Sequence, residues 1–456
     1  MSVILPFVSI FLLHVLTATS ETILQCLSLH SDPSRPISAV TYFPKNPSYP
    51  PILEAYIRNL RFSSPTTPKP TFIVAPTHVS HIQASIICCK RFNLEIRTRS
   101  GGHDFEGLSY MSQTPFVIVD MFMLKSVEVD VEDQTAWVDS GSTIGELYYA
   151  IAEKSRVLGF PAVPVPEVVT VFRIEKTLEQ DASDLVFQWQ YVADKIHDGL
   201  FIRVVLSPVT RSDRKTIKAK FNALFLGNSQ ELLSVMNQSF PQLGLVAEQC
   251  IQMSWIQSVL FWDNYPVGTS VDVLLQRHAT KEKFLKKKSD YVQQPISKAA
   301  LEGIWKMMME LEKPVFTFNP YGGKMGEISE FETPFPHRFG NIFKIQYSVS
   351  WDEEGEDVAK QYLYQIRRLY DYMTPYVSYS PRSSYLNYRD VDIGVNGPGN
   401  ATYAQASVWG RKYFKRNFDR LVQVKTKVDP SNFFRYEQSI PSLASAHSIV
   451  SEKKKP

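Results

Sequence analysis

The stretch that most constrains the fold is residues 99–110, RSGGHDFEGLSY. It follows residues 93–97, whose alternating pattern predicts a strand, so the loop begins at a strand end, where ligands often sit. Gly101 and Gly102 permit positive φ angles and a close approach of the backbone, which lets the turn present several N–H groups to an anion. His103 follows at once. Spacing alone leaves two interpretations open, a ligand-binding loop and a tight hairpin turn with a surface histidine.

Residues 99–110 resemble, in order, the flavin-attachment loop of the plant berberine bridge enzyme-like oxidases, which belong with flavoproteins of the vanillyl-alcohol-oxidase type. The resemblance implies an α+β fold with a PCMH-type FAD-binding domain and a substrate domain, an antiparallel sheet covered by helices. It implies that His103 is bonded to the 8α-methyl group of FAD. Four residues before it are expected at the cofactor: Arg99, Ser100, Gly101 and Gly102.

The sequence departs from that family after residue 162. The family pattern continues from GFPA into a glycine-rich stretch with a cysteine and then into further strands, whereas here GFPA runs directly into VPVPEVVTVF. The resemblance therefore implies an incomplete FAD domain, without the cysteine that attaches to the flavin 6-position. The expected linkage is monocovalent, through His103. A non-catalytic truncated paralogue and a carbohydrate-binding wall glycoprotein, neither able to hold FAD, remain as alternatives.

The predicted organisation begins with a secretory signal, because residues 3–16 are mostly apolar and small residues follow at 18–20. That run is too short to span a bilayer comfortably. The expected parts are a signal peptide at 1–20, a truncated FAD domain at 21–165, a substrate domain at 166–380, a C-terminal berberine-bridge segment packing on the FAD domain at 381–445, and a disordered tail at 446–456.

Charge and metal-ligand spacing exclude several classes of function. The formal net charge of +3 on 456 residues gives no argument for nucleic acid or a membrane surface. There is no CxxC motif, and His78 and His81 share a helix face without a third ligand, so we expect a solvated pair and no metal site.

Covalent features fit an extracellular protein. The resemblance pairs Cys26 with Cys88, and we expect Cys89 and Cys250 to be free buried thiols. Glycosylation sequons begin at Asn237 and Asn400. With the signal, these features predict a secreted protein of the cell wall or apoplast, expected to be a monomer.

Two further stretches supply candidate catalytic residues. Residues 343–349, FKIQYSV, alternate as a strand that carries Lys344 and Gln346 on one face, although a solvent-facing polar side remains an alternative. By resemblance Gln346 faces the flavin, where some relatives have a glutamate base; a glutamine cannot be a base. Residues 385–390, YLNYRD, match a motif in which Tyr385 and Asn387 touch the isoalloxazine and Tyr388 lies at the substrate.

Tyr388 is the expected base. A phenol titrates near pH ~10 in water, so it needs a nearby cation or a hydrogen bond to its phenolate, and Lys344 is the expected cation. The alternative is an ordinary core tyrosine. Ser142 and Thr143 lie in a turn that by resemblance contacts the flavin, although either would equally serve as a helix cap.

The expected reaction is oxidation of a small alcohol or carbohydrate-type substrate by hydride transfer to flavin, with molecular oxygen or another acceptor reoxidising it. Elsewhere, a helix face is expected to carry the solvated lysines at 286–288, and a single C-terminal helix is expected to end at Pro430.

Overall fold

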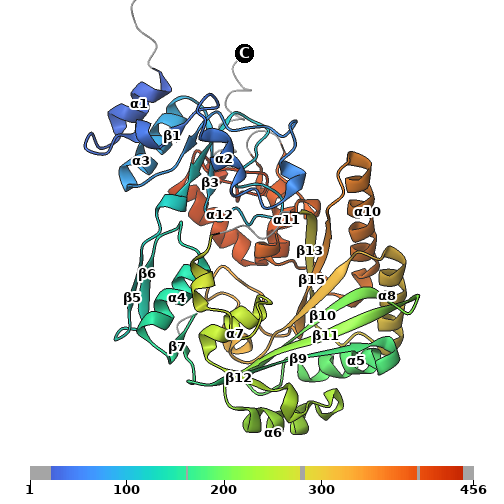
Figure 1. The fold of residues 1–456 in the computed structure, drawn as a ribbon. Coiled ribbons are helices and arrows are strands. Elements are labelled where there is room, and N and C mark those ends of the chain that lie inside the picture. Colours follow the sequence, from blue (N-terminus) through green and yellow to red (C-terminus); the bar gives the residue numbers. More distant parts are fainter. Residues whose placement is uncertain (1–21, 161–162, 278–282, 398–400, 445–456) are drawn as a thin grey trace, which may run out of the picture.

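The computed structural model describes residues 22–160, 163–277, 283–397 and 401–444. The predicted signal peptide, Asn400 and the predicted tail lie outside these residues. Figure 1 shows a small sheet with its helices at the top, a hairpin with a helix at the left, and a large sheet at the right. Within the described part of the chain, no helix is long and apolar enough to cross a membrane.

The first sheet has the order β1-β2-β4-β3 (Thr41–Tyr42, Ile73–Val74, Phe116–Asp120 and Glu95–Arg99). Strands β2 and β3 both run parallel to β4, whose five residues are all buried. Val117 joins a core with α1 (Ile23–His30) and α3 (Val79–Arg91), whereas Ile118 joins another with α2 (Tyr49–Glu54). Burial on both faces explains the continuous apolar run FVIVD.

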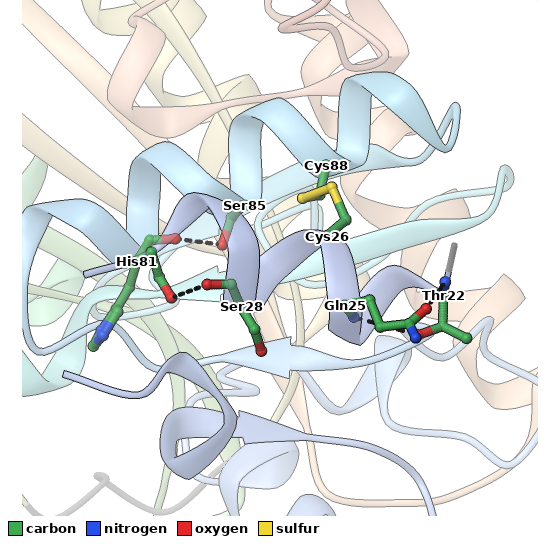
Figure 2. Close-up of a disulfide and its surroundings, with 8 residues drawn as sticks. Thr22, Gln25, Cys26, Ser28, His81, Ser85 and Cys88 are labelled. Atoms are coloured by element: carbon green, nitrogen blue, oxygen red, sulfur yellow. Dashed lines mark hydrogen bonds between the residues drawn. A yellow bond between two sulfur atoms is a disulfide. The ribbon is translucent and has the colours of Figure 1, made fainter. Parts of the chain in front are cut away.

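Helix α3 carries the predicted disulfide, in which Cys88 is bonded to Cys26 of α1 (Figure 2). The prediction of a solvated histidine pair on this helix was wrong. His81 is buried, and its Nε2 lies 2.9 Å from the carbonyl oxygen of Arg35, while His78 caps the helix N-terminus. Among the described residues no group of three or more metal-ligand side chains forms. Of the two free thiols, Cys89 is buried and Cys250 is half-buried.

A smaller unit follows, made of the hairpin β5–β6 (Val127–Asp130 and Thr135–Val138), helix α4 (Ile144–Lys154) and the short pair β7–β8 (Leu158–Gly159 and Val163–Pro164). Strand β6 pairs only with β5 among the described strands, and all four of its residues are exposed. The side chain of Trp137 is 83% exposed. An open strand edge with a large exposed aromatic side chain is unusual on a folded domain.

Among the described residues, the large sheet contains seven strands, all paired antiparallel, in the order β12-β9-β11-β10-β14-β15-β13. Their bounds, from β9 to β15, are Val169–Thr177, Leu200–Arg211, Arg214–Phe225, Ile251–Met253, Phe284–Val292, Val315–Pro320 and Phe343–Trp351. Helices α5 (Ala182–Val192), α8 (Lys298–Leu311) and α10 (Glu356–Tyr372) cover one face (Figure 1). Helices α6 (Ser229–Ser239), α7 (Trp255–Trp262) and α9 (Lys324–Glu327) lie in the connections.

The C-terminal region contains two helices, α11 (Tyr403–Phe414) and α12 (Asn417–Val428), so the prediction of one continuous helix was wrong. The chain turns at Lys415, where φ is 45°. This turn folds Phe418 onto Gly410, where an added Cβ would lie 2.3 Å from the phenylalanine ring. Past α12, Glu437 pairs with Arg97 of β3, at 3.2 Å, which ties this region to the first sheet.

The lysines at 286–288 lie on strand β13 and not on a solvated helix face. Lys286 and Lys288 are buried, and both make ion pairs with carboxylates from distant segments. A run of charges predicts solvent exposure only when no such partners exist, and these partners are invisible to local pattern.

Candidate functional site

The glycine loop follows strand β3 directly. Gly102 has a φ of 63°, and a Cβ at this position would lie 2.0 Å from the carbonyl oxygen of Tyr56, so no other residue fits. The backbone N–H groups of Gly101, Gly102 and His103 make no hydrogen bond to any part of the chain that the structure describes. Adjacent unused N–H groups in a turn form a cradle for an anion.

Arg99 anchors this loop. Its side chain is fully buried, and its guanidinium donates to Asp120 Oδ2 at 2.9 Å and to the carbonyl oxygen of Leu53 at 2.6 Å. The prediction placed Arg99 at a cofactor, but its side chain is directed into the protein. The structure gives it the role of holding the loop in place.

His103 and Ser100 are the exposed members of the loop. The His103 ring lies over Gly101, where an added Cβ would be 2.4 Å from the ring carbon Cδ2. Arg58 donates to the carbonyl oxygen of Gly101 at 3.1 Å. Partial desolvation, and secondarily the positive charge of Arg58, lower the pKa of His103. The neutral imidazole, which has a nucleophilic nitrogen, is therefore favoured.

The glycine loop meets the 385–390 motif, which lies nearly 300 positions further along the chain. The carboxylate of Asp104 pairs with Arg389 at 3.4 Å, and the ring centroids of Phe105 and Tyr388 are 6.1 Å apart. The residues Leu386–Tyr388 form a short 3₁₀ helix. Two of the three predicted site stretches are thus brought together.

Lys344 of β15 connects the third stretch to the same place. Its Nζ lies 3.5 Å from the ring centroid of Tyr385 and 4.4 Å from that of Tyr388. The side chain is 7% exposed, and burial together with the charge of Arg203 lowers the pKa of Lys344 to about 7. Gln346 lies on the same face of β15, half-buried, opposite Ser289 and Thr317 of the neighbouring strands.

The electrostatics of Tyr388 differ from the expected pattern. Burial raises the pKa of its phenol, and the cation that opposes this rise is Arg203 of β10. Lys344 lies over the ring faces. Sequence reasoning missed Arg203, although the alternation of buried and half-buried residues along β10 places it on the open face of the sheet.

A cavity of about 950 Å³ opens in front of these side chains. Arg203 and Asn319 line it, and Arg203 Nε donates to Asn319 Oδ1 at 2.7 Å. The Asn319 amide nitrogen is buried and has no hydrogen-bond partner among the described residues. The remaining lining includes aromatic rings, a Gly-Gly turn and three carboxylates: Phe335, Tyr385, Tyr388, Gly322, Gly323, Asp194, Asp198 and Glu327. The cavity can therefore hold a polar molecule of moderate size.

Ser142 and Thr143 both use their hydroxyl groups within the protein. Thr143 caps helix α4 by accepting from the backbone N–H of Glu146 at 3.1 Å, and Ser142 donates to the carbonyl oxygen of Ser126 at 3.2 Å. The helix-cap interpretation of this turn is confirmed for Thr143. A flavin contact at either residue stays a prediction.

Known protein families match the two segments that carry the glycine loop and the 385–390 motif. Residues 70–171 match the family described as "FAD binding domain", and residues 384–441 match "Berberine and berberine like". Berberine bridge enzyme-like 8 of Arabidopsis thaliana is 46% identical over 508 residues, covering 94% of this chain and 96% of that protein. The tetrahydroberberine oxidase of Berberis wilsoniae is 43% identical over 509 residues, covering 94% and 95%.

Solved structures agree with these matches. Phl p 4, a grass pollen allergen with glucose dehydrogenase activity, superimposes with a TM-score of 0.86 at 36% identity, covering 92% of this chain and 100% of that one. The berberine bridge enzyme of Eschscholzia californica superimposes with a TM-score of 0.85 at 29% identity, covering 93% and 99%. The expected α+β fold, with its FAD-binding and antiparallel-sheet parts, is confirmed. The chain belongs to the berberine bridge enzyme-like family of FAD-dependent oxidoreductases.

Proposed function

We propose that this chain is a secreted oxidoreductase that holds FAD through a single covalent bond to His103 and oxidises a polyhydroxylated, carbohydrate-type alcohol. The observation that carries the proposal is the contact of the glycine loop with the Tyr385–Tyr388 wall beside the cavity. A small-molecule substrate and an electron acceptor, molecular oxygen or another, follow from the family.

The residues present fit the redox end and the phosphate end of FAD. The unused N–H groups of Gly101, Gly102 and His103 suit a pyrophosphate anion, and the exposed, neutral imidazole of His103 suits covalent attachment. The side chains of Tyr385 and Asn387 offer an aromatic ring and an amide beside the cavity. When bound, FAD supplies a hydride acceptor for the substrate carbon.

Side chains of this protein accept the substrate's proton and bind the substrate. Tyr388 takes the hydroxyl proton as a phenolate, the form that the charge of Arg203 stabilises against burial, and becomes a neutral phenol. Asp194 and Asp198 accept hydrogen bonds from further hydroxyl groups, while Phe335 packs against the apolar face of a sugar ring. Gln346 cannot act as a base, and in this proposal it orients the substrate or cofactor. The glucose dehydrogenase activity of the structural relative Phl p 4 supports this substrate class.

A second candidate is a truncated, non-catalytic paralogue or wall-associated glycoprotein that does not hold FAD. The alignment with one relative extends over 508 residues whereas this chain has 456, so at least 52 aligned positions have no counterpart here. Strand β6, whose edge is open and whose Trp137 is exposed, lines a pocket together with Phe160, the last described residue before the break proposed after residue 162. We propose that the segment lost there covers this edge in the relatives.

The domain limits, secretion, glycosylation and monomeric state are also proposals. We propose an FAD domain at 21–165, a substrate domain at 166–380 and a berberine-bridge segment at 381–445. Asn237 is exposed on α6, as a glycan requires. Loss of mass from the secreted protein after enzymatic deglycosylation would support modification of Asn237 and Asn400, and an unchanged mass would exclude it.

The test of the catalytic proposal is the rate of flavin reduction by a panel of sugars under anaerobic conditions. We expect Tyr388→Phe to slow reduction about 100-fold or more, the scale of general base catalysis, without loss of flavin. Tyr403→Phe, a change on the exposed side of α11, is the matched control and should leave the rate unchanged. An unaltered rate in Tyr388→Phe would remove this tyrosine from the mechanism. Wild-type protein that never acquires flavin would favour the second candidate.

A further inference from the structure

A cluster of five charged residues, four of them buried and Asp392 at the rim, lies between the glycine loop and the 385–390 motif. It consists of two lysines of β13 and three carboxylates from other segments: Lys286, Lys288, Glu106, Asp390 and Asp392. We call it the lysine cluster. None of its members lines the cavity described above.

Lys286 is the central member. Its Nζ donates to Glu106 of the glycine loop and, at 2.7 Å, to Asp390 Oδ1. The side chains of all three residues are 1% exposed. The neighbouring Lys288 donates to the second oxygen of Asp390 at 2.6 Å. Both carboxylate oxygens of Asp390 are therefore occupied by lysines of one strand.

The outer side of the cluster is closed by further pairs. Lys288 also donates to Asp392 at 3.0 Å, and Arg367 of α10 pairs with the same carboxylate at 2.7 Å. Burial opposes the charged form of Lys286, but the carboxylates of Asp390 and Glu106 outweigh it, so the pKa of Lys286 is raised and the amine stays charged.

The positions of these partners in the sequence show which site residues the cluster connects. Glu106 comes three residues after His103, and Asp390 comes two residues after Tyr388. These segments are distant in sequence, and Lys286 bridges them directly. A buried charge pair stabilises a fold weakly in net terms but strongly disfavours arrangements in which either charge loses its partner.

We propose that Lys286 and Glu106 are positioning residues that fix the distance between His103 and Tyr388. The catalytic consequence rests on the function proposed above, since a misplacement of about 1 Å between reacting groups can cost roughly 100-fold in rate. We call the contacts of Lys286 with Glu106 and Asp390 the clamp. These contacts do not depend on FAD.

The test uses Glu106→Gln in the full-length secreted protein. The amide keeps the shape of the side chain and one acceptor for Lys286, but it removes the charge. Asp290→Asn is the matched control, because Asp290 is also fully buried and paired with an arginine, Arg382, at 2.6 Å, but its side chain makes no hydrogen bond or ion pair to the described residues of the glycine loop or the 385–390 motif. Glu106→Asp keeps the charge on a shorter side chain.

The first readout is hydrogen–deuterium exchange of flavin-free protein. We expect Glu106→Gln to accelerate exchange about tenfold in both 99–110 and 385–392, and Asp290→Asn to leave both unchanged even if its melting temperature falls equally. Glu106→Asp should partly restore protection. Faster exchange spread over the whole protein, or confined to one segment, would overturn the proposed clamp.

The second readout is made on flavin-loaded protein. We expect Glu106→Gln to lower kcat about tenfold or more and to reduce the fraction of flavin bound covalently, with KM little changed because the cavity lining is intact. Normal kcat and normal covalent flavin in this variant would overturn the positioning role. If wild-type protein carries no flavin, the proposed function fails while the exchange experiment still decides the clamp. If Glu106→Gln does not fold, the exchange comparison between Glu106→Asp and wild type decides it.

Discussion

Replacing Lys344 by methionine should stabilise the protein at low pH while it impairs the site. The amine lies among apolar and aromatic atoms, is 7% exposed, and has the positive charge of Arg203 as its neighbour. A charged lysine in such surroundings raises the free energy of the folded state. A methionine of similar length carries no charge and therefore removes this penalty.

The magnitude follows from the pKa. Lys344 titrates at about 7 in the folded protein against an ordinary value of 10.5. At about 1.4 kcal/mol per pKa unit, this difference corresponds to a penalty of roughly 5 kcal/mol on the folded state when the amine is charged. The cation–π contacts of Lys344 with the faces of Tyr385 and Tyr388, about 1 kcal/mol each, offset roughly 2 kcal/mol of this penalty. We therefore expect a gain of about 3 kcal/mol from Lys344→Met.

The pH dependence has a definite sign. Below about pH 7 the amine is charged in both states, so the penalty is fully present. Between pH 7 and 10.5 the unfolded chain binds more protons than the folded one, so wild-type stability rises with pH and the penalty disappears. The advantage of Lys344→Met should therefore be largest at pH 6 and shrink steadily toward pH 10.

The assay is urea unfolding of flavin-free protein at pH 6 and pH 9.5, with wild type, Lys344→Met and the exposed Lys427→Met as control. We expect the advantage of Lys344→Met to fall by about 3 kcal/mol between these pH values, and the control to change by less than about 0.5 kcal/mol. A gain that does not vary with pH, or destabilisation at pH 6, would refute the reasoning.

Three other changes test separate parts of the structure. Replacing Cys26 and Cys88 by alanine opens a loop with a sequence separation of 62 residues and should cost about 4 kcal/mol, which unfolding under non-reducing conditions would measure; a loss below about 1 kcal/mol would contradict this estimate. Gly102→Ala must displace the Tyr56 backbone and should cost about 2 kcal/mol or more, whereas Gly326→Ala, with open space around it, should cost little; equal effects would remove the steric argument. Trp137→Ser should reduce the aggregated fraction that forms beside the proposed monomer at high protein concentration in sedimentation experiments; an unchanged fraction would show that the β6 edge does not cause aggregation.

Local sequence predicted the loop and the strands well, for identifiable physical reasons. The paired glycines before His103 mark a turn that only glycine can form, and the structure requires glycine at Gly102. The alternating stretches predicted as strands at 93–97 and 343–349 became part of β3 and of β15, since side-chain alternation follows strand geometry closely.

The errors came from long-range partners. Lys286 and Lys288 were predicted on a solvated face because Glu106 and Asp390 lie at least 100 positions away in sequence. His81 was predicted in a solvated pair because the carbonyl oxygen of Arg35, which lies 2.9 Å from its Nε2, is 46 positions away in sequence. Arg203 escaped notice because its partner Asn319 is on a strand that joins β10 only in the folded sheet.

Whether His103 holds FAD in a chain whose FAD domain we propose to be shortened can be decided by a single absorbance experiment. The secreted protein is purified, and its spectrum is recorded before and after acid precipitation, with His103→Ala in parallel. We expect a flavin band that stays with the precipitated wild-type protein and that is released or absent in His103→Ala. A colourless wild-type protein, even after expression with added FAD, would contradict covalent attachment at His103.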